Sequence, residues 1–280
     1  MFPVLLAIGP VVIKTVNLAF VLALLAGLFV FWRKGREEHY EEAMLFDGLL
    51  LSLLFGLVLA RAAFIAMRFG EFGLNVMNWL DLVNKPGFSI SALFIGSAFF
   101  LYRYAKKKKW DEFEILDFWV MGVTLAQVFI WFGYFLAGTA LGTETNLPWG
   151  MVFPSVFTKH HPTQLYYALF FSALFWYLSW AEVRYRTFVW YRFGKNTAQT
   201  GYLLSVCMLL TGLFSLVMGL VTVPEVVVAG VRADSIFSLV LTVFGLSMLY
   251  SRSGRSFPWR RKQQSKLEQF TAIIAEQHPS

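Results

Sequence analysis

The second long apolar stretch of the sequence carries an arginine, Arg61, deep within the segment LVLARAAFIAM. A charged side chain inside a membrane-spanning segment is costly, so each one is a candidate functional residue. A guanidinium binds phosphate through two parallel hydrogen bonds, and a lipid phosphate is one predicted partner of Arg61. Two other arrangements stay open: the side chain reaches the outer interface, or it pairs with Asp117 or Gln127.

A second candidate, His161, lies in KHHPTQLYY, which holds two of the four histidines. The following proline favours an extended or turn backbone, and Thr163 can cap the next helix. The imidazole could act as a base or bind phosphate. The alternative is that His161 fixes the loop against the helix start, and the lack of a completing Cys, Asp or second spaced His favours it. We expect neither a metal nor a cofactor.

Charged residues are otherwise scarce in the apolar stretches. There is none between Gly201 and Pro224, and the stretch 117–138 has only Asp117 at its start and Gln127 within it. An enzyme that handles a charged phospholipid is expected to place several cations and a base around its substrate. The pattern therefore argues against a dense catalytic site within the apolar stretches.

The composition identifies the elements that must position these side chains. Of the residues, 58% are hydrophobic and 15% are charged, whereas a soluble domain has about 25% charged residues. The net charge of +7 is interpreted as the excess of Lys and Arg in cytoplasmic loops. We therefore predict an all-α integral membrane protein without a nucleic-acid partner. The single cysteine, Cys207, excludes an intrachain disulfide.

Seven apolar stretches approach the length of about 20 residues that spans a membrane. We predict a seven-helix transmembrane domain over residues 1–251 and a basic, partly amphipathic cytoplasmic tail over 252–280. The first stretch is interpreted as a retained helix, because neither a basic segment nor a small-residue cleavage site accompanies it. The stretches are Val11–Phe31, Phe46–Met67, Ser89–Ala105, Asp117–Gly138, Gln164–Val183, Thr200–Val221 and Asp234–Tyr250.

The basic residues predict the orientation of these helices. Alternate connections, together with the tail, hold 18 Lys and Arg on one side and 4 on the other. Because Lys and Arg favour the cytoplasmic side, the N-terminus is predicted to lie outside and the C-terminus in the cytoplasm.

The order of motifs resembles that of the bacterial prolipoprotein diacylglyceryl transferases, from about Ile8 to Tyr250. IGPVVIK is similar to the opening IGP motif of the family, and LARAAF to its Gly-Gly-Arg-x-Gly segment, with Arg61 on the arginine. PGFSISALFIG resembles Gly-Met-Ser-Phe-His-Gly-Gly-Leu-Ile-Gly. The most specific match is HPTQLY, which resembles His-Pro-Ser-Gln-Leu-Tyr and contains Gln164 and Tyr166.

The resemblance implies a multi-pass protein of the bacterial cytoplasmic (inner) membrane, with a central cavity that opens sideways to lipid. The family transfers a diacylglyceryl group from phosphatidylglycerol to the thiol of a lipobox cysteine in lipoprotein precursors. The reaction needs a base, because the thiolate is the nucleophile, and cations for the departing glycerol phosphate. The implied partners are phospholipid, with phosphatidylglycerol expected, lipobox-containing precursors and the membrane.

The sequence departs from the family pattern at most positions that carry this chemistry. Ser91 stands at the position of the family histidine, and a hydroxyl cannot replace an imidazole as a base near neutral pH. Trp131 stands at an arginine, and the sixth stretch has none of the expected Arg or Glu. Tyr134 and Ala137 stand at two asparagines, Thr139 at a glutamate, and Gly133, Phe135 and Gly142 are retained.

The leading hypothesis is a member of this family that binds phospholipid through Arg61, with weak or absent transfer activity. His161 is the remaining catalytic candidate, and Ser91 is expected to be inactive. A working transferase with relocated catalytic residues is the first alternative, and a non-enzymatic transporter or assembly scaffold is the second. Structural or cavity roles are expected for Gly133, Tyr134, Gly142, Gln164, Tyr166 and Asp117.

Overall fold

The computed structural model describes residues 2–8, 11–82, 84–154, 156–185, 199–224, 227–228 and 231–252. The predicted tail, from residue 253 onward, lies outside the described residues. Helices dominate the described residues, in which one antiparallel strand pair precedes the first helix and two more lie in connections between helices. The strands are β1 (Val4–Ile8), β2 (Val11–Lys14), β3 (Met151–Val152), β4 (Lys159–His160), β5 (Val227–Val228) and β6 (Val231–Arg232).

Each of the seven predicted apolar stretches falls on a long helix. The long helices are α1 (Thr15–Glu37), α2 (Glu42–Met67), α5 (Ile90–Lys108), α6 (Glu112–Ala137), α7 (Thr163–Tyr185), α8 (Tyr202–Met218) and α9 (Ala233–Arg252). Two short helices, α3 (Phe69–Phe72) and α4 (Val76–Leu80), lie between α2 and α5. Within the described residues, α1, α2, α6 and α9 are long and apolar enough to cross a membrane.

The first predicted stretch is wrong at its start. Residues Val11–Lys14 form strand β2, which pairs with β1 through Ile8 opposite Val11, and the helix begins only at Thr15. Three β-branched residues in succession, at positions 11–13, favour an extended backbone. The IGPVVIK motif therefore belongs to a strand pair that leads into α1.

Helix α6 begins earlier than its apolar stretch because an acidic residue caps it. The Asp111 carboxylate accepts hydrogen bonds from the backbone N–H groups of Phe113 and Glu114, at 3.0 and 3.1 Å. A carboxylate at this position satisfies N–H groups that have no partner within the helix. Hydropathy alone does not detect such a polar first turn.

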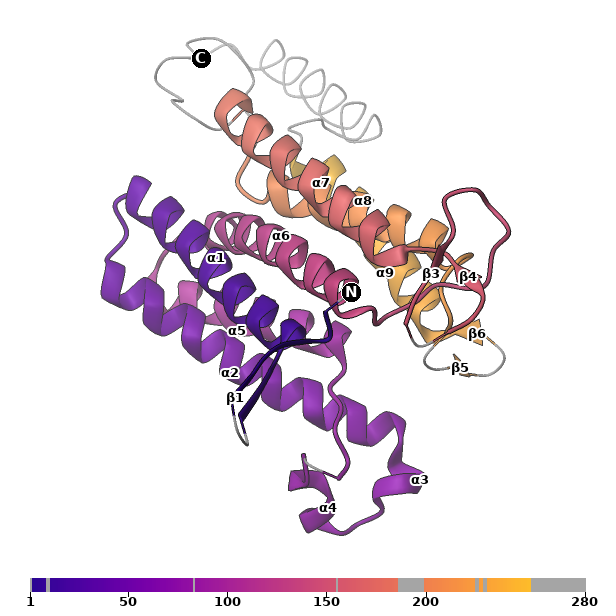
Figure 1. Ribbon diagram of the computed structural model, residues 1–280. Coiled ribbons are helices and arrows are strands. Elements are labelled where there is room, and N and C mark those ends of the chain that lie inside the picture. The colour runs from indigo at the N-terminus through magenta and orange to yellow at the C-terminus, as the bar shows by residue number, and fades with distance from the viewer. Residues whose placement is uncertain are drawn as a thin grey trace, which may run out of the picture.

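Helix α6 lies at the centre of the bundle (Figure 1). Helices α1, α2 and α5 lie on one side of it and α7, α8 and α9 on the other. The packing of α1 on α6 is close, because a Cβ on Gly122 would lie 2.6 Å from the carbonyl oxygen of Gly27. Small residues allow membrane helices to approach at the level of their backbones.

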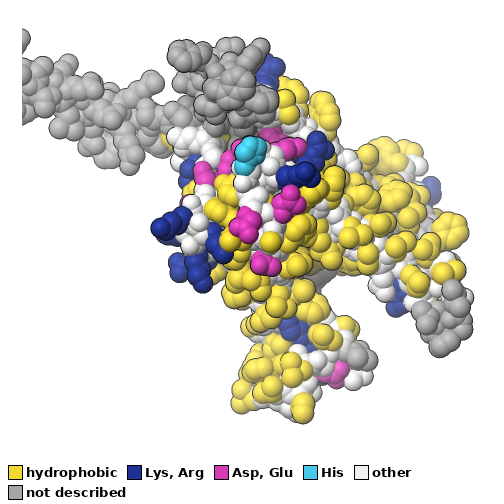
Figure 2. All heavy atoms as spheres, turned by 90° about the vertical axis from the view of Figure 1, so that its left-hand side faces the viewer, with side chains coloured by type: hydrophobic (Ala, Val, Ile, Leu, Met, Phe, Trp, Pro, Cys, Tyr) yellow, Lys and Arg dark blue, Asp and Glu magenta, His cyan; other side chains and the backbone are white. Residues whose placement is uncertain are grey.

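The outward faces of the helices are apolar. Leu25, Val58 and Val243 are 57%, 62% and 60% exposed. Figure 2 shows hydrophobic side chains over much of one face of the molecule, with charged side chains concentrated in one region and a few elsewhere. Soluble proteins rarely expose apolar surface on this scale, so this surface fits contact with lipid tails.

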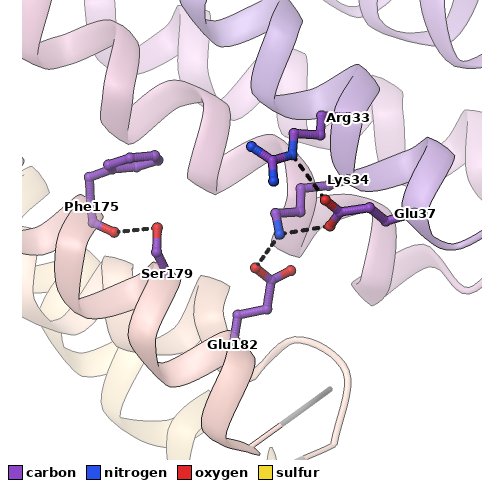
Figure 3. A network of polar contacts seen from close by, with 6 residues as sticks. All are labelled: Arg33, Lys34, Glu37, Phe175, Ser179 and Glu182. Carbon is purple, nitrogen blue, oxygen red and sulfur yellow. Dashed lines mark hydrogen bonds and ion pairs between the residues drawn. The ribbon is translucent and has the colours of Figure 1, made fainter. Parts of the chain in front are cut away.

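A buried ion pair joins α1 to α7 (Figure 3). The Lys34 ammonium lies 2.7 Å from the carboxylate of Glu182, which is 8% exposed, and 2.9 Å from that of Glu37. Arg33 pairs with Glu37 on the same side of α1, at 3.0 Å. We call this end of the bundle, where α6 begins, the charged end. Nearby, burial and a hydrogen bond to Glu114 raise the pKa of the Tyr40 hydroxyl above its usual range.

Candidate functional site

The HPTQLY segment lies at the end of the bundle opposite the charged end, where α6 finishes. The backbone N–H of His161 donates to the Thr143 carbonyl at 3.0 Å, and that of Gly142 donates to the His161 carbonyl at 3.1 Å. The N–H of Thr143 donates to Val221, just after α8, at 2.8 Å. Three segments that are distant in sequence therefore meet beside the start of α7.

The side chain of His161 is half-buried and has one weak hydrogen bond. Its Nδ1 lies 3.4 Å from the hydroxyl oxygen of Tyr166, one turn along α7. This distance is well beyond the usual length of about 3 Å for such a bond. Among the described residues no carboxylate orients the imidazole, so the structure does not form a dyad or triad around it. The neighbouring His160 is held more firmly, with Nδ1 at 2.8 Å from the Gly142 carbonyl.

Gln164 is fully buried and joins α7 to the end of α6. Its Nε2 donates to the Thr139 carbonyl at 2.5 Å, whereas its Oε1 has no hydrogen-bond partner among the described residues. An unpartnered buried acceptor costs about 1–3 kcal/mol. The structure does not show Thr163 as the cap of α7, because the backbone N–H groups of Leu165 and Tyr166 donate to the Pro162 carbonyl at 3.0 and 3.3 Å. The Thr163 hydroxyl instead donates to the Ala140 carbonyl at 2.9 Å.

Gly142 permits the close approach of these segments. A Cβ at this position would lie 2.6 Å from Thr163 Cγ2, 2.7 Å from the Val221 carbonyl oxygen and 2.8 Å from His161 Cβ. Two of these contacts involve a backbone atom or a Cβ, which cannot rotate away. The requirement for glycine here is therefore steric.

The structure adds one cation to this region, Arg232, which leads into α9. Its Nη2 donates to the Thr222 hydroxyl at 2.9 Å and its Nη1 to the Thr222 carbonyl at 2.8 Å, and Nη1 also contacts the Gly219 carbonyl. Its Nε is buried without a partner among the described residues. Thr222 pairs with Gly142 through an isolated β-bridge. We call Gly142, His161, Gln164, Tyr166 and Arg232 the corner site.

An aromatic cluster lies between α6, α7 and α8. Trp131 stacks on Tyr167 with ring centroids 4.0 Å apart and an interplanar angle of 9°. Tyr134 lies edge-on to Trp131 at 5.7 Å, and Phe214 lies edge-on to Tyr167 at 5.3 Å. On the far side, Gly133 packs against α1, because a Cβ there would lie 2.2 Å from the Cβ of Ala19. The predicted residues Gly133 and Tyr134 are therefore packing residues in this structure.

Arg61 is apart from the corner site and organises the connection between α2 and α5. Its guanidinium donates to the carbonyls of Trp79, Lys85, Gly87 and Asp81, at 2.9, 2.9, 3.0 and 3.1 Å. A guanidinium has five N–H donors, so these contacts leave one. The rings of Phe64, Phe72 and Phe88 surround it at 5.9, 5.2 and 6.0 Å. Neither Asp117 nor Gln127, the partners considered from sequence, is among these contacts.

A family model described as prolipoprotein diacylglyceryl transferase matches residues 3–251. The chain belongs to this family. The resemblance inferred from the motifs is therefore confirmed over nearly the whole described length.

Curated relatives carry the name phosphatidylglycerol–prolipoprotein diacylglyceryl transferase. The chain is 34% identical to the protein of Clostridium tetani over 164 residues, which cover 57% of this chain and 65% of that protein. It is 30% identical to the protein of Wolbachia pipientis wMel over 174 residues, covering 60% and 65%. It is 24% identical to the protein of Finegoldia magna over 225 residues, covering 80% and 85%. The chain thus spans just under two thirds of the first two relatives.

Two further family positions lie away from the corner site. Ser91, at the position of the family histidine, is half-buried in the first turn of α5. Asp117 is fully buried near the charged end, where it accepts hydrogen bonds from the backbone N–H groups of Gly201 and Leu204 at 2.8 and 2.9 Å. Asp117 therefore caps the start of α8 and has a structural role here.

Arg232 is the residue of this region that sequence reasoning missed. The sequence identifies it only as one of the four basic residues predicted to lie outside. Its position immediately before the apolar stretch Asp234–Tyr250 is the signal that could have revealed it, because such a residue lies at a helix end. Among the described residues, no group of three or more His, Cys, Asp or Glu side chains is placed to hold a metal ion.

Proposed function

We propose that this family member binds an anionic phospholipid at the corner site and transfers its diacylglyceryl group weakly or not at all. The observation that carries the proposal is the stack of Trp131 on Tyr167. A large aromatic ring occupies the position at which the family resemblance implies an arginine. Electrostatic stabilisation of a departing phosphate needs preorganised positive charge around it, and an indole ring carries none.

The corner site supports the binding half of this proposal. Arg232 brings a guanidinium to this end of the bundle, where its Nη2 lies 3.8 Å from the Asp234 carboxylate. Its buried Nε has no hydrogen-bond partner among the described residues. The unpartnered Oε1 of Gln164 can accept a hydrogen bond from a hydroxyl of the glycerol headgroup. A phosphatidylglycerol headgroup offers both a phosphate and hydroxyl donors, so it matches the two unsatisfied groups.

The membrane arrangement proposed for this function is a seven-span bundle in the bacterial cytoplasmic membrane. The seven long helices and the 18-to-4 division of basic residues support it. With the N-terminus outside, the corner site faces the outer leaflet. Lipoprotein precursors with a lipobox are the proposed protein partners, by analogy with the names of the relatives.

The second candidate function is a working transferase with relocated residues, and Arg232 is the observation that favours it. In that mechanism His161 takes the proton of the lipobox thiol. The thiolate then forms a carbon–sulfur bond to the glyceryl carbon, while the bond from that carbon to the phosphate oxygen breaks. Arg232 neutralises the departing glycerol phosphate. The long contact of His161 with Tyr166 at 3.4 Å gives this base little orientation.

Complementation separates the two functions. The chain is expressed in bacteria depleted of their own transferase, and lipid labelling of a lipoprotein is followed, with the host enzyme as positive control. We expect labelling at the background level although the chain is present in the membrane. Labelling that persists, and that disappears in His161→Ala or Arg232→Ala, would establish the transferase.

A further inference from the structure

A second site lies at the charged end, far from the corner site. A cavity of about 720 Å³ opens between the first half of α2 and the last half of α5. Its lining is unusual in charge, with four cations and one carboxylate. The lining residues are Asp47, Leu51, Phe100, Arg103, Tyr104, Lys106, Lys107 and Lys108. We call this cavity the basic groove.

The basic groove has a fixed aromatic floor. The hydroxyl of Tyr104 donates to the Met44 carbonyl at 3.1 Å, so the ring crosses from α5 to α2. The ring lies on Gly48, where a Cβ would be 2.8 Å from it. Phe100 stacks on Tyr104 with ring centroids 6.4 Å apart, and Phe55 follows Phe100 at 5.5 Å. The floor therefore runs from the charged end toward the apolar middle of the helices.

The cations of the basic groove lack a carboxylate partner among the residues that the structure describes. Within the described part of the chain, no carboxylate lies at ion-pair distance from Arg103 or from Lys106, Lys107 and Lys108, although Asp47 is in the same cavity. The helix dipole favours cations in the last turn of α5, but it neutralises no full charge. The basic groove thus holds an excess of positive charge.

The cations of α1 at the same charged end provide an internal comparison. Arg33 and Lys34 each pair with Glu37, and Arg36 lies 3.6 Å from Glu42. A bias of basic residues toward the cytoplasm accounts for both groups equally. This bias does not explain why the cations of α1 are paired with carboxylates while those of the basic groove are not. It also does not explain the cavity beside the groove cations.

We propose that the basic groove binds the phosphate of an anionic phospholipid, with an acyl chain lying along Leu51 and Phe100. Basic pockets between membrane helices on the cytoplasmic side are suited to such headgroups. A lipid fits better than free phosphate because the groove continues onto exposed apolar surface. Leu51, Leu54 and Val58 are 45%, 59% and 62% exposed, on the same side of α2. This site is independent of the corner site and of any transfer activity.

Lipid titration of the full-length chain tests the proposal. The chain is purified in detergent, phosphatidylglycerol is added, and bound lipids are counted by native mass spectrometry. The groove variant is Arg103→Gln with Lys107→Gln, and the matched control is Arg33→Gln with Arg36→Gln. Both lose two positive charges at the same end of the bundle. We expect roughly tenfold weaker binding of phosphatidylglycerol in the groove variant and a change below about twofold in the control.

Three arms complete the experiment. Phosphatidylcholine, which has no net charge, should bind equally to all variants, and inorganic phosphate at the lipid concentration should not displace phosphatidylglycerol. If the groove variant does not insert, Lys106→Gln with Lys107→Gln replaces it, because these changes leave the contact of the Lys108 ammonium with the Tyr104 ring in place. Equal losses in groove and control variants, no loss in either, or displacement by inorganic phosphate would each overturn the proposal.

Discussion

The indole of Trp131 lies flat on the ring of Tyr167, with centroids 4.0 Å apart and planes inclined by 9°. Such a pair contributes about 0.5–1.5 kcal/mol beyond the apolar area that it buries. The stack joins α6 to α7, and Phe214 extends it to α8. Position 131 therefore serves packing between helices. An arginine could occupy this position only if the aromatic cluster were displaced.

This packing predicts that Trp131→Arg does not restore a catalytic site. The substitution removes the stack and places a charge among aromatic rings. Loss of a fully buried aromatic side chain costs roughly 3–5 kcal/mol, and Trp131 is half-buried, so we expect a smaller loss. We expect a clearly lower melting temperature in detergent and no gain of lipoprotein labelling. Trp131→Phe is the control and should melt close to the parent protein. A Trp131→Arg variant with unchanged melting would contradict the packing role.

The ion pair between α1 and α7 predicts an asymmetry between its two members. Lys34→Ala leaves the Glu182 carboxylate buried without its cation, which costs about 3–5 kcal/mol. Glu182→Gln is milder, because Lys34 keeps Glu37 at 2.9 Å. Thermal unfolding in detergent should therefore give a larger loss for Lys34→Ala.

The double variant Lys34→Met with Glu182→Leu sharpens this prediction. Replacing a buried ion pair with apolar side chains of similar volume is often neutral or stabilising. The double variant should recover most of the stability that Lys34→Ala loses. If both single variants and the double variant are equally unstable, the pair acts through its shape and not its charge.

Arg61 offers a prediction about order in the connection 68–89. Arg61→Ala removes four hydrogen bonds to backbone carbonyls, so amide hydrogen exchange in residues 73–87 should become faster. Arg61→Lys should be intermediate, because an ammonium cannot reproduce the planar arrangement of donors. Exchange in α6 should be unchanged, which serves as the control. The amount of phosphatidylglycerol that co-purifies with each variant tests the predicted lipid role of Arg61. That role requires less co-purified lipid in Arg61→Ala than in the parent protein.

The sequence predicted the helices well because hydrophobic length is a direct physical signal, and each apolar stretch overlaps a long helix. It was wrong where polar or β-branched residues set a boundary, as at Asp111 and at Val11. It also grouped His161, Gln164 and Tyr166, since they share one short segment. Arg232 was missed, because its contact with Thr222 depends on how the connection between α8 and α9 folds back. The partners of Arg61 depend in the same way on a connection that hydropathy does not describe.

The basic-residue asymmetry predicts the topology directly. A reporter that is active only in the cytoplasm should be active when fused after Lys109 or at Ser280, and silent when fused after Asn146. The proposal of a basic groove in the inner leaflet and a corner site in the outer leaflet depends on this result. Activity of the fusion after Asn146 would rule out the seven-span arrangement.

Gly142→Ala tests whether the corner site is held by steric contact. The added methyl group would meet the Val221 carbonyl at 2.7 Å and His161 Cβ at 2.8 Å, and both are fixed to backbone. Overpacking of this kind costs about 1–3 kcal/mol, so the variant should melt at a lower temperature. It should also lose lipid bound at the corner site, because His161 and the end of α8 must move apart. The matched control is Gly70→Ala, because a Cβ there meets nothing within 4 Å. Equal behaviour of the two variants would show that the chain can relax around Gly142, and the steric explanation for this glycine would then fail.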